Sequence, residues 1–349
     1  MQNVLVLFGG ASPEHDVSVV SAACVLDAFP RDRFNPVTVG ITKEGNWLLC
    51  ESDSAVIRSG EWKEEETHIM PSLNSLQRGI FAEGIGFIPV DAAFPVLHGE
   101  GGEDGCVQGL LKLAGIPCVG CSPAASAVCM DKYYTNCVLD AAGIPQAAWV
   151  SFTKSEWLSD RATLTEYMIE ELLLPIFVKP SATGSSIGIS KAATSDELTA
   201  AVDNAFLYGE RVVCEEFIDG AEIEVAVLGT PAEASVCGRI IPAGEFYDYE
   251  SKYVSDSKLI IPADIPDATS ERIRFLATEA FDALSCSGMA RVDFLLRTAD
   301  GDIFLNEVNT IPGFTPISMY PKLWQECGVS YGELITRLIT DAMTNSRES

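Results

Sequence analysis

Short apolar runs alternate with longer stretches of helical period along the first third of the chain. Asn3–Phe8 and Ala92–Leu97 are nearly continuous apolar runs, a pattern typical of strands that are buried on both faces. Each run leads through a glycine-containing turn into a helical pattern, and the first helix should begin near Ser12 and Pro13, which suit the N-cap and the first helical position. Strands that alternate with helices form parallel sheets, so this region predicts an α/β fold.

The rest of the chain predicts shorter strands and several helices. The strands should run over Pro175–Pro180, Val212–Ile218, Ala221–Leu228 and Ala234–Ile241. The helices should run over Ser126–Ala142, Ser195–Tyr208 and Ala268–Leu284, with two more closing the chain. At about 150 residues per domain, this length suggests two or three domains.

One further pair of strands predicts a β-hairpin near the C-terminus. Met289–Arg297 and Asp302–Val308 are rich in Val, Phe, Leu and Ile, and Ala299-Asp300-Gly301 between them supplies a turn. Because side chains alternate between the two faces of a strand, Arg291 and Asp293 share a face, and so do Glu307 and Asn309.

If those two faces coincide, Asp293, Glu307 and Asn309 present carboxylate and amide oxygens to one point, with Arg291 beside them. Such hard oxygen ligands suit Mg²⁺, which is often shared between protein oxygens and substrate phosphates. The simpler interpretation is an ordinary solvated polar face, since Asp and Glu are common on exposed faces. Spacing alone does not separate the two interpretations.

The charge balance limits the partners of this chain. Its 50 acidic and 23 basic side chains leave a net charge of −27, which argues against nucleic acids and anionic membranes as partners. No apolar run approaches the length of a membrane span, so we expect no membrane insertion. In so acidic a chain, a cleft that binds phosphates must contain local lysines, arginines or metal ions.

The cysteines indicate a reducing compartment. There are 11 of them, an odd number scattered along a mid-sized chain, and we interpret them as free thiols of a cytoplasmic protein. Cys118 and Cys121 form one C-x-x-C, but no second pair or His pair completes a zinc site, so buried core cysteines are favoured. Met1–Phe8 resembles a first strand and lacks the features of a signal peptide.

Two glycine-containing loops follow the apolar strands of the first third. Glu14, in the first loop, could complement the dipole of the following helix or hold an ammonium group. His98 opens the second loop, His98–Gly105, and could contact a ligand or be a buried structural histidine. Neither loop is a G-x-G-x-x-G motif, so a dinucleotide site is disfavoured.

A third candidate segment lies in the middle of the chain. The predicted strand Pro175–Pro180 carries Lys179 and precedes the Gly/Ser-rich segment 181–188. The backbone N–H groups of this segment could cradle phosphates, although a plain turn with a solvated lysine fits equally. Three acids cluster beyond it and could bind an adenine amino group and ribose hydroxyls: Glu215, Glu216 and Glu222. Residues 245–264 lack a clean period and predict a mobile lid that carries Lys252 and Tyr253.

Taken together, these segments resemble the D-alanine–D-alanine ligase family of the ATP-grasp superfamily over nearly the whole chain. Each motif alone is weak to moderate, but their order is specific. The motifs are G-G-x-S-x-E-H-x-V-S (9–18), H-G-x-x-G-E-D-G (98–105), M-D-K (130–132), V-K-P-S-x-x-G-S-S (178–186), E-E-F-x-x-G-x-E (215–222), Y-D-Y-E-x-K-Y (247–253), R-V-D-F (291–294) and N-E-V-N-T-x-P-G-F-T (306–315).

The resemblance implies an architecture of three domains with ATP between the second and third. They are an N-terminal Rossmann-like domain with a parallel sheet (1–125), a central ATP-grasp domain (126–217) and a C-terminal catalytic domain (218–349). It also implies ATP and two Mg²⁺ ions, for which Mn²⁺ can substitute, and a homodimer.

The resemblance implies a role for each matching residue. Groups that bind or activate the first substrate or stabilise the oxyanion would be Glu14, Ser185, Tyr253, Arg291 and Gly313. Groups that bind ATP would be Lys132, Lys179, Glu215, Glu216, Glu222 and Lys252. Further substrate contacts would be His98, Ser318 and Met319, and the metal ligands Asp293, Glu307 and Asn309.

The implied reaction is ATP-dependent ligation of two D-alanine molecules through a D-alanyl phosphate, for synthesis of peptidoglycan precursors. Relatives that use D-lactate tend to carry His at the position of Tyr253, and those that use D-lactate or D-serine tend to carry Arg at the position of Met319, so this chain favours D-alanine. Alternatives are a D-serine or D-lactate ligase, another ATP-grasp carboxylate–amine ligase, a nucleotide-binding regulator with a decayed site, and a dehydrogenase.

Overall fold

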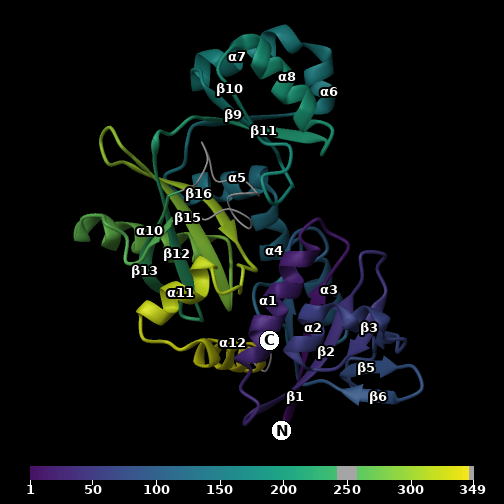
Figure 1. Ribbon diagram of the computed structural model, residues 1–349. Helices are drawn as coiled ribbons and strands as arrows, with labels where there is room; N and C mark the ends of the chain where they lie inside the picture. Colours follow the sequence, from purple (N-terminus) through teal and green to yellow (C-terminus); the bar gives the residue numbers. More distant parts are fainter. Residues whose placement is uncertain (242–257, 346–349) are drawn as a thin grey trace.

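The structure is a computed structural model that describes residues 1–241 and 258–345 (Figure 1). Its described residues form four sheets, two within residues 1–125, one within 126–217 and one within 218–349. The fold is α/β, as the alternation of strands and helices predicts.

The N-terminal sheet has the order β3-β2-β1-β7, with β1 (Gln2–Gly9) at its centre. β2 (Phe34–Ile41) and β7 (Ala92–Val96) pair with β1 in parallel, and β3 (Trp47–Cys50) adds an antiparallel edge. The associated helices are α1 (His15–Asp27), α2 (Ser54–Ser59), the 3₁₀ turn η1 (Glu61–Glu64) and α3 (Cys106–Leu113). A separate antiparallel sheet contains β4 (Ile69–Pro71), β5 (Gly79–Ala82) and β6 (Gly86–Pro89).

The central sheet is antiparallel, with the order β10-β9-β11-β8. Its strands are β8 (Trp149–Thr153), β9 (Ile176–Pro180), β10 (Ser190–Ala192) and β11 (Arg211–Glu216). The helices α6 (Lys154–Ser159), α7 (Arg161–Leu172) and α8 (Ser195–Ala205) pack on it and enclose a core of their own, around residues such as Trp157, Met168 and Val178. This unit stands apart at the top of Figure 1.

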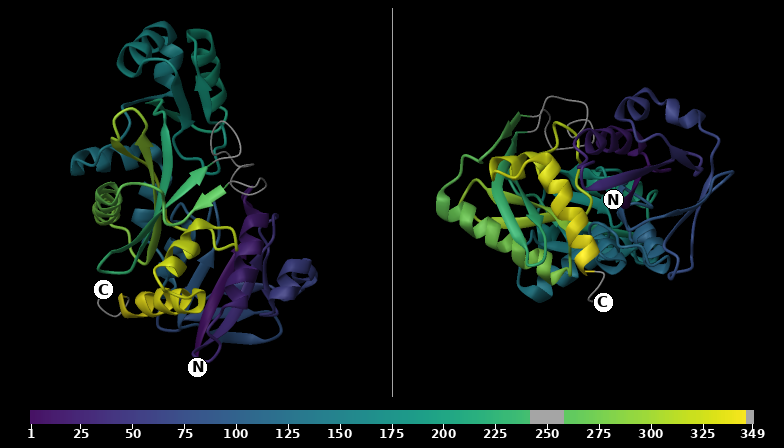
Figure 2. Two further views of the ribbon diagram at one scale, coloured as in Figure 1. Left: turned by 60° about the vertical axis from the view of Figure 1, so that its left-hand side comes forward. Right: turned by 90° about the horizontal axis from the view of Figure 1, so that it is seen from below.

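The C-terminal sheet is also antiparallel, with the order β14-β13-β12-β15-β16. Its strands are β12 (Gly220–Leu228), β13 (Glu233–Ile241), β14 (Lys258–Ile260), β15 (Met289–Arg297) and β16 (Ile303–Asn309). α10 (Asp267–Ala283) packs on one face, and α11 (Met319–Glu326) and α12 (Tyr331–Asn345) follow the sheet. α12 joins one apolar core with the N-terminal sheet, which fixes these two units against each other (Figure 2).

The helix expected over Ser126–Ala142 is two helices. α4 (Pro123–Met130) ends before Asp131, whose backbone is extended at φ −98° and ψ 108°. The Asp131 carboxylate accepts hydrogen bonds from the backbone N–H groups of Tyr133 and Tyr134 and so caps α5 (Lys132–Ala142). The break makes Lys132 the first residue of α5.

The first helix also begins later than expected. α1 starts at His15, and Ser12 and Pro13 lie in the turn before it. The Ser12 hydroxyl donates to the carbonyl of His98 at 2.7 Å instead of capping the helix. This bond ties the two N-terminal loops together and so holds Glu14 beside the second loop.

Candidate functional site

The hairpin β15–β16 places its predicted polar residues on one face. Asp293 lies opposite Glu307, and Arg291 lies opposite Asn309, in the antiparallel register. The register shifts directly after Asp293, which inserts Asn306 as an extra residue and directs it towards the central domain. The Asn306 side-chain oxygen lies 3.4 Å from Lys179 Nζ, so the bulge links the two domains.

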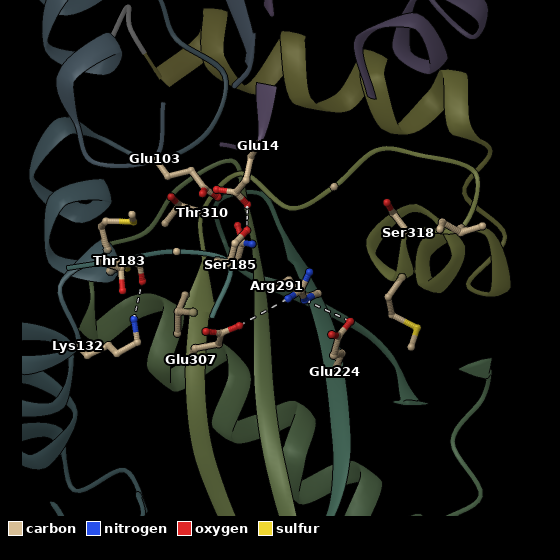
Figure 3. A pocket seen from close by; sticks show the side chains of 18 of the residues that line it. Glu14, Glu103, Lys132, Thr183, Ser185, Glu224, Arg291, Glu307, Thr310 and Ser318 are labelled. Atoms are coloured by element: carbon tan, nitrogen blue, oxygen red, sulfur yellow. Dashed lines mark hydrogen bonds and ion pairs between the residues drawn. The ribbon is translucent and has the colours of Figure 1, made fainter. Parts of the chain in front are cut away.

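Arg291 is the centre of this face. Its Nε and Nη2 groups donate to the two carboxylate oxygens of Asp293 at 2.8 and 2.7 Å. Glu224 and Glu307 lie on either side of its guanidinium, at 3.2 and 3.9 Å (Figure 3). Burial opposes the positive charge, but the three carboxylates outweigh burial and hold the pKa of Arg291 well above its usual value. Arg291 is therefore a permanent cation facing the site.

A wall of the site comes from the N-terminal loops and the Gly/Ser segment. The Ser185 hydroxyl donates to Glu14 Oε1 at 2.5 Å, across 171 residues of sequence. The other oxygen of Glu14 lies against Gly99, where a Cβ atom would come within 2.4 Å of it. Glu103 lies beside Glu14 and accepts from the Gly99 N–H at 2.7 Å. Burial, reinforced by Glu14, raises the pKa of Glu103 to about 8.

His98 is buried behind this wall. One ring nitrogen lies 3.1 Å from the carbonyl of Ile311, and the other lies 3.3 Å from the Ser21 hydroxyl. Burial lowers the pKa of His98 to about 4, so the imidazole is neutral at pH 7. Its side chain lines a cavity with Gly10 and Leu97, and it is not among the residues that line the cavity beside Glu14.

A cavity of about 300 Å³ lies between the central and C-terminal domains. Five of the residues predicted to bind ATP line it together: Lys132, Lys179, Glu215, Glu216 and Glu222. Lys179 Nζ binds Glu215 at 2.5 Å, and Lys132 Nζ donates to the Thr183 carbonyl at 2.7 Å. Phe177 and Ile189 add apolar surface to the same cavity. A lining that combines lysines with apolar groups suits a nucleotide.

A second cavity, of about 110 Å³, lies beside Glu14 and Arg291. Gly313, Ser318 and Met319 line it from the loop before α11. The Ser318 hydroxyl interacts with the Thr315 hydroxyl at 2.7 Å and accepts from the Thr315 N–H at 3.0 Å. Met319 packs against Gly238, where a Cβ atom would lie 2.6 Å from the sulfur.

Lys252 and Tyr253, predicted to belong to a lid, lie outside the described residues. So does most of the segment 245–264 that was expected to form it.

The donor set fits a divalent cation. Asp293 and Glu307 face each other on paired strands and line the nucleotide cavity, and Asn309 lies one pair further along the same face. Within residues 1–241 and 258–345, no three His, Cys, Asp or Glu side chains are close enough to hold a metal ion by themselves. The amide of Asn309 and phosphate oxygens would complete such a site, as is usual for Mg²⁺.

Three residues of the site were missed in the sequence: Glu224, Glu103 and Asn306. Glu224 lies two residues after Glu222 on β12, so strand alternation places both on one face and could have identified it. Glu103 belongs to a quoted motif, but nothing local indicates that it is partly buried beside Glu14. Asn306 faces the site only because of the bulge, which strand periodicity does not reveal.

The fold and the site define an ATP-grasp enzyme. Its nucleotide cavity lies between two domains that each contain an antiparallel sheet, and acidic residues line this cavity. Models of two protein families match this chain. The model described as "D-ala D-ala ligase N-terminus" matches residues 3–121, and "D-ala D-ala ligase C-terminus" matches residues 138–340. The chain therefore belongs to the D-alanine–D-alanine ligase family.

Individual relatives agree over nearly their whole length. A D-alanine–D-alanine ligase of Acetivibrio thermocellus is 47% identical over 97% of this chain and 95% of its own. One from Clostridium acetobutylicum is 45% identical over 97% of each. The solved VanG D-Ala:D-Ser ligase from Enterococcus faecalis matches with a TM-score of 0.90 and 36% identity, covering 98% of this chain and 99% of that one. The D-alanine–D-alanine ligase from Coxiella burnetii matches at 0.87 and 32%, covering 100% and 97%.

Membership in this family implies the use of ATP and of small-molecule substrates. In the part of the chain that the structure describes, no helix has the length and apolar character needed to cross a membrane.

Proposed function

We propose that this chain ligates two D-alanine molecules to D-alanyl-D-alanine, with ATP as the energy source. One observation carries the proposal: the nucleotide cavity and the smaller cavity beside Glu14 share the residues Lys132, Glu224 and Glu307. A phosphate bound in the first cavity and a carboxylate bound in the second would therefore meet beside Arg291 and the predicted metal ligands. Phosphoryl transfer needs mainly positioning and charge neutralisation, which this arrangement can supply.

The first D-alanine would bind in the smaller cavity. Glu14, held by Ser185, would accept its ammonium group, with Tyr253 closing over it. His98 would support binding of this substrate indirectly, because its buried side chain holds the surrounding loops in place. The carboxylate of this D-alanine would attack the γ-phosphorus of ATP, forming an O–P bond and releasing ADP.

The second D-alanine would bind against Ser318 and Met319. Its amine would attack the carbonyl carbon of the D-alanyl phosphate, which forms the C–N bond, and would lose a proton. Inorganic phosphate would leave when the tetrahedral intermediate collapses. Arg291 and the backbone N–H of Gly313 would stabilise the oxyanion of the tetrahedral intermediate. The acyl phosphate hydrolyses in water, so closure of the site protects it.

ATP would be held by two kinds of groups. Lys132, Lys179 and Lys252 would bind its phosphates, and Glu215, Glu216 and Glu222 its adenine and ribose. Asp293, Glu307 and Asn309 would hold two Mg²⁺ ions, or Mn²⁺ in their place. These ions would neutralise phosphate charge during transfer.

The test is phosphate release from Mg-ATP on addition of D-alanine, with the product identified by mass. We expect ADP, phosphate and D-alanyl-D-alanine in equal amounts. ATP binding without D-alanine-dependent phosphate release would contradict the proposal and support a nucleotide-binding regulator.

Substrate choice is tested in the same assay by competition among D-alanine, D-serine and D-lactate. Met319 offers only a weakly accepting thioether sulfur to a hydroxyl group, so we expect D-alanine to be incorporated in preference. Preferred incorporation of D-serine would contradict this expectation.

The remaining parts of the proposal concern assembly and location. We place the enzyme in the cytoplasm as a homodimer, as the resemblance to the family implies. Light scattering at several concentrations would measure the mass, and a concentration-independent monomer would contradict the dimer.

A further inference from the structure

Glu224 lies at the junction of the two cavities, although no motif singled it out. It pairs with Asp293 in the antiparallel register, and Asp293 pairs with Glu307, so three carboxylates form one row across β12, β15 and β16. The Glu224 side chain is 4% exposed, whereas that of Glu307 is 36% exposed. Of the two acids that flank Asp293, Glu224 is therefore the more deeply buried.

Each carboxylate of the row reaches the guanidinium of Arg291. Asp293 binds it through both oxygens, Glu224 lies 3.2 Å from its Nε, and Glu307 lies 3.9 Å from its Nη2. Figure 3 shows Glu224 and Glu307 on opposite sides of Arg291. The guanidinium is thus held by one acid from each of three neighbouring strands.

These three acids would have different partners once ATP and metal ions are bound. Asp293 and Glu307 are the predicted ligands of the metal ions, and oxygens that coordinate a cation hold a guanidinium less tightly. Glu224 lies on the far side of Arg291 from Glu307 and is not in the predicted metal set (Figure 3).

We propose that Glu224 is a positioning residue. It keeps Arg291 in position to stabilise the oxyanion while Asp293 and Glu307 coordinate the metal ions. The proposal rests on the proposed function. It adds different roles within the row, in which Glu224 on β12 positions the arginine, and Asp293 and Glu307 on β15 and β16 bind the metal ions.

Two measurable consequences follow. Without the charge of Glu224, Arg291 depends more on Asp293, so it competes with the cation for that carboxylate. The same loss removes negative charge from the metal site. Both effects weaken cation binding, and a less well held guanidinium stabilises the oxyanion less.

The test is Glu224→Gln, which keeps the size of the side chain and removes its charge. We expect kcat to fall about tenfold, less than the loss from removing an oxyanion donor outright, with the KM for D-alanine changed less than about twofold. We also expect the dissociation constant for Mn²⁺, measured by electron paramagnetic resonance without turnover, to rise severalfold.

The matched control is Glu233→Gln, at the exposed start of β13 in the same sheet, which should change neither quantity. Glu224→Asp, which retains the charge, should restore Mn²⁺ affinity to near the wild-type value. A purely structural role would lower the melting temperature without separating kcat from KM and without changing Mn²⁺ affinity.

The outcomes separate the two proposals. Wild-type protein that makes no D-alanyl-D-alanine contradicts the proposed function. If the wild type is active and Glu224→Gln retains both wild-type kcat and wild-type Mn²⁺ affinity, the role of Glu224 is overturned. If Glu224→Gln does not fold, kcat is compared among Glu224→Asp, Arg291→Lys and the double variant. Losses that multiply, as for independent sites, would overturn the role of Glu224, and losses that do not multiply would support it.

Discussion

The hairpin β15–β16 and the loops above it build the site in different ways. On the hairpin, Arg291, Asp293, Glu307 and Asn309 are placed by backbone pairing between adjacent strands. In the loops, Glu14 meets Ser185 across 171 residues, through contacts that depend on three separate segments. Changes on the hairpin should therefore alter chemistry and leave the geometry intact, whereas changes in the loops should act through geometry.

The loops also hold unfavourable backbone angles that the hairpin lacks. Ser185 and Ser186 have φ values of 50° and 57°, in the left-handed region that costs most side chains energy. Ser185 is held there while its hydroxyl binds Glu14. The loop wall thus depends on tertiary contacts for its conformation, and we expect it to respond to small steric changes.

The largest effect should come from the hairpin. Asp293→Ala removes a predicted metal ligand and the bidentate partner of Arg291, so we expect kcat to fall about 10³-fold, with a folded protein. Asp300→Asn, in the turn of the same hairpin, removes an exposed partner of Arg297 and should leave kcat unchanged. Steady-state phosphate release measures both, and a wild-type rate for Asp293→Ala would refute the metal assignment.

The next effect should come from the loop that holds Glu14. In Gly99→Ala the new Cβ would lie 2.4 Å from Glu14 Oε2, and φ is 71°, so Glu14 must move. We expect kcat/KM for D-alanine to fall roughly 10- to 100-fold, as is typical of a displaced substrate group.

The control for this variant is Gly101→Ala in the same loop. Gly101 has φ of 81° but open space around its Cβ position, so the substitution carries a similar backbone cost without the clash. Equal losses of kcat/KM in the two variants would show that the backbone angle matters and the contact with Glu14 does not.

A smaller effect should follow from Ser185→Ala. It removes one hydrogen bond to Glu14, worth about 1 kcal/mol, so we expect a loss of roughly fivefold in kcat/KM for D-alanine. Ser195→Ala, at the exposed start of α8, is the control. A loss as large as that of Asp293→Ala would mean that the hydroxyl takes part in the chemistry.

The smallest effect on activity, and a distinct effect on stability, should come from Glu103. Its pKa is about 8 in the folded protein against an ordinary value of 4.5, so the folded state binds more protons between these values. The contribution of Glu103 to stability is therefore fully present below pH 4.5 and is lost as the pH rises towards 8. Glu103→Gln should gain stability over wild type as the pH rises through this window.

Urea unfolding between pH 5 and 9 measures this difference, with exposed Glu100→Gln as the control. The activity of Glu103→Gln near neutral pH should change less than about twofold, since the protonated acid and the amide are alike in shape and charge. A constant difference in stability across the pH range would show that Glu103 titrates normally.

Strand periodicity predicted the hairpin well. Both strands were placed within a residue or two of β15 and β16, and the shared face of Asp293 and Glu307 is confirmed by their register. The helix break at Asp131 and the late start of α1 were predicted wrongly, because in each case a side chain satisfies a backbone or loop group that periodicity does not take into account.

The sequence by itself determined most of the elements, the alternation of faces on each strand and the family, because these depend on local patterns and ordered motifs. Only the tertiary structure decided which groups meet: Glu14 with Ser185, Lys179 with Asn306, and Glu224 with Arg291. The physical reason is that burial, charge pairing and pKa depend on distances between segments far apart in the chain. No local pattern encodes those distances, and the packing of three domains sets them.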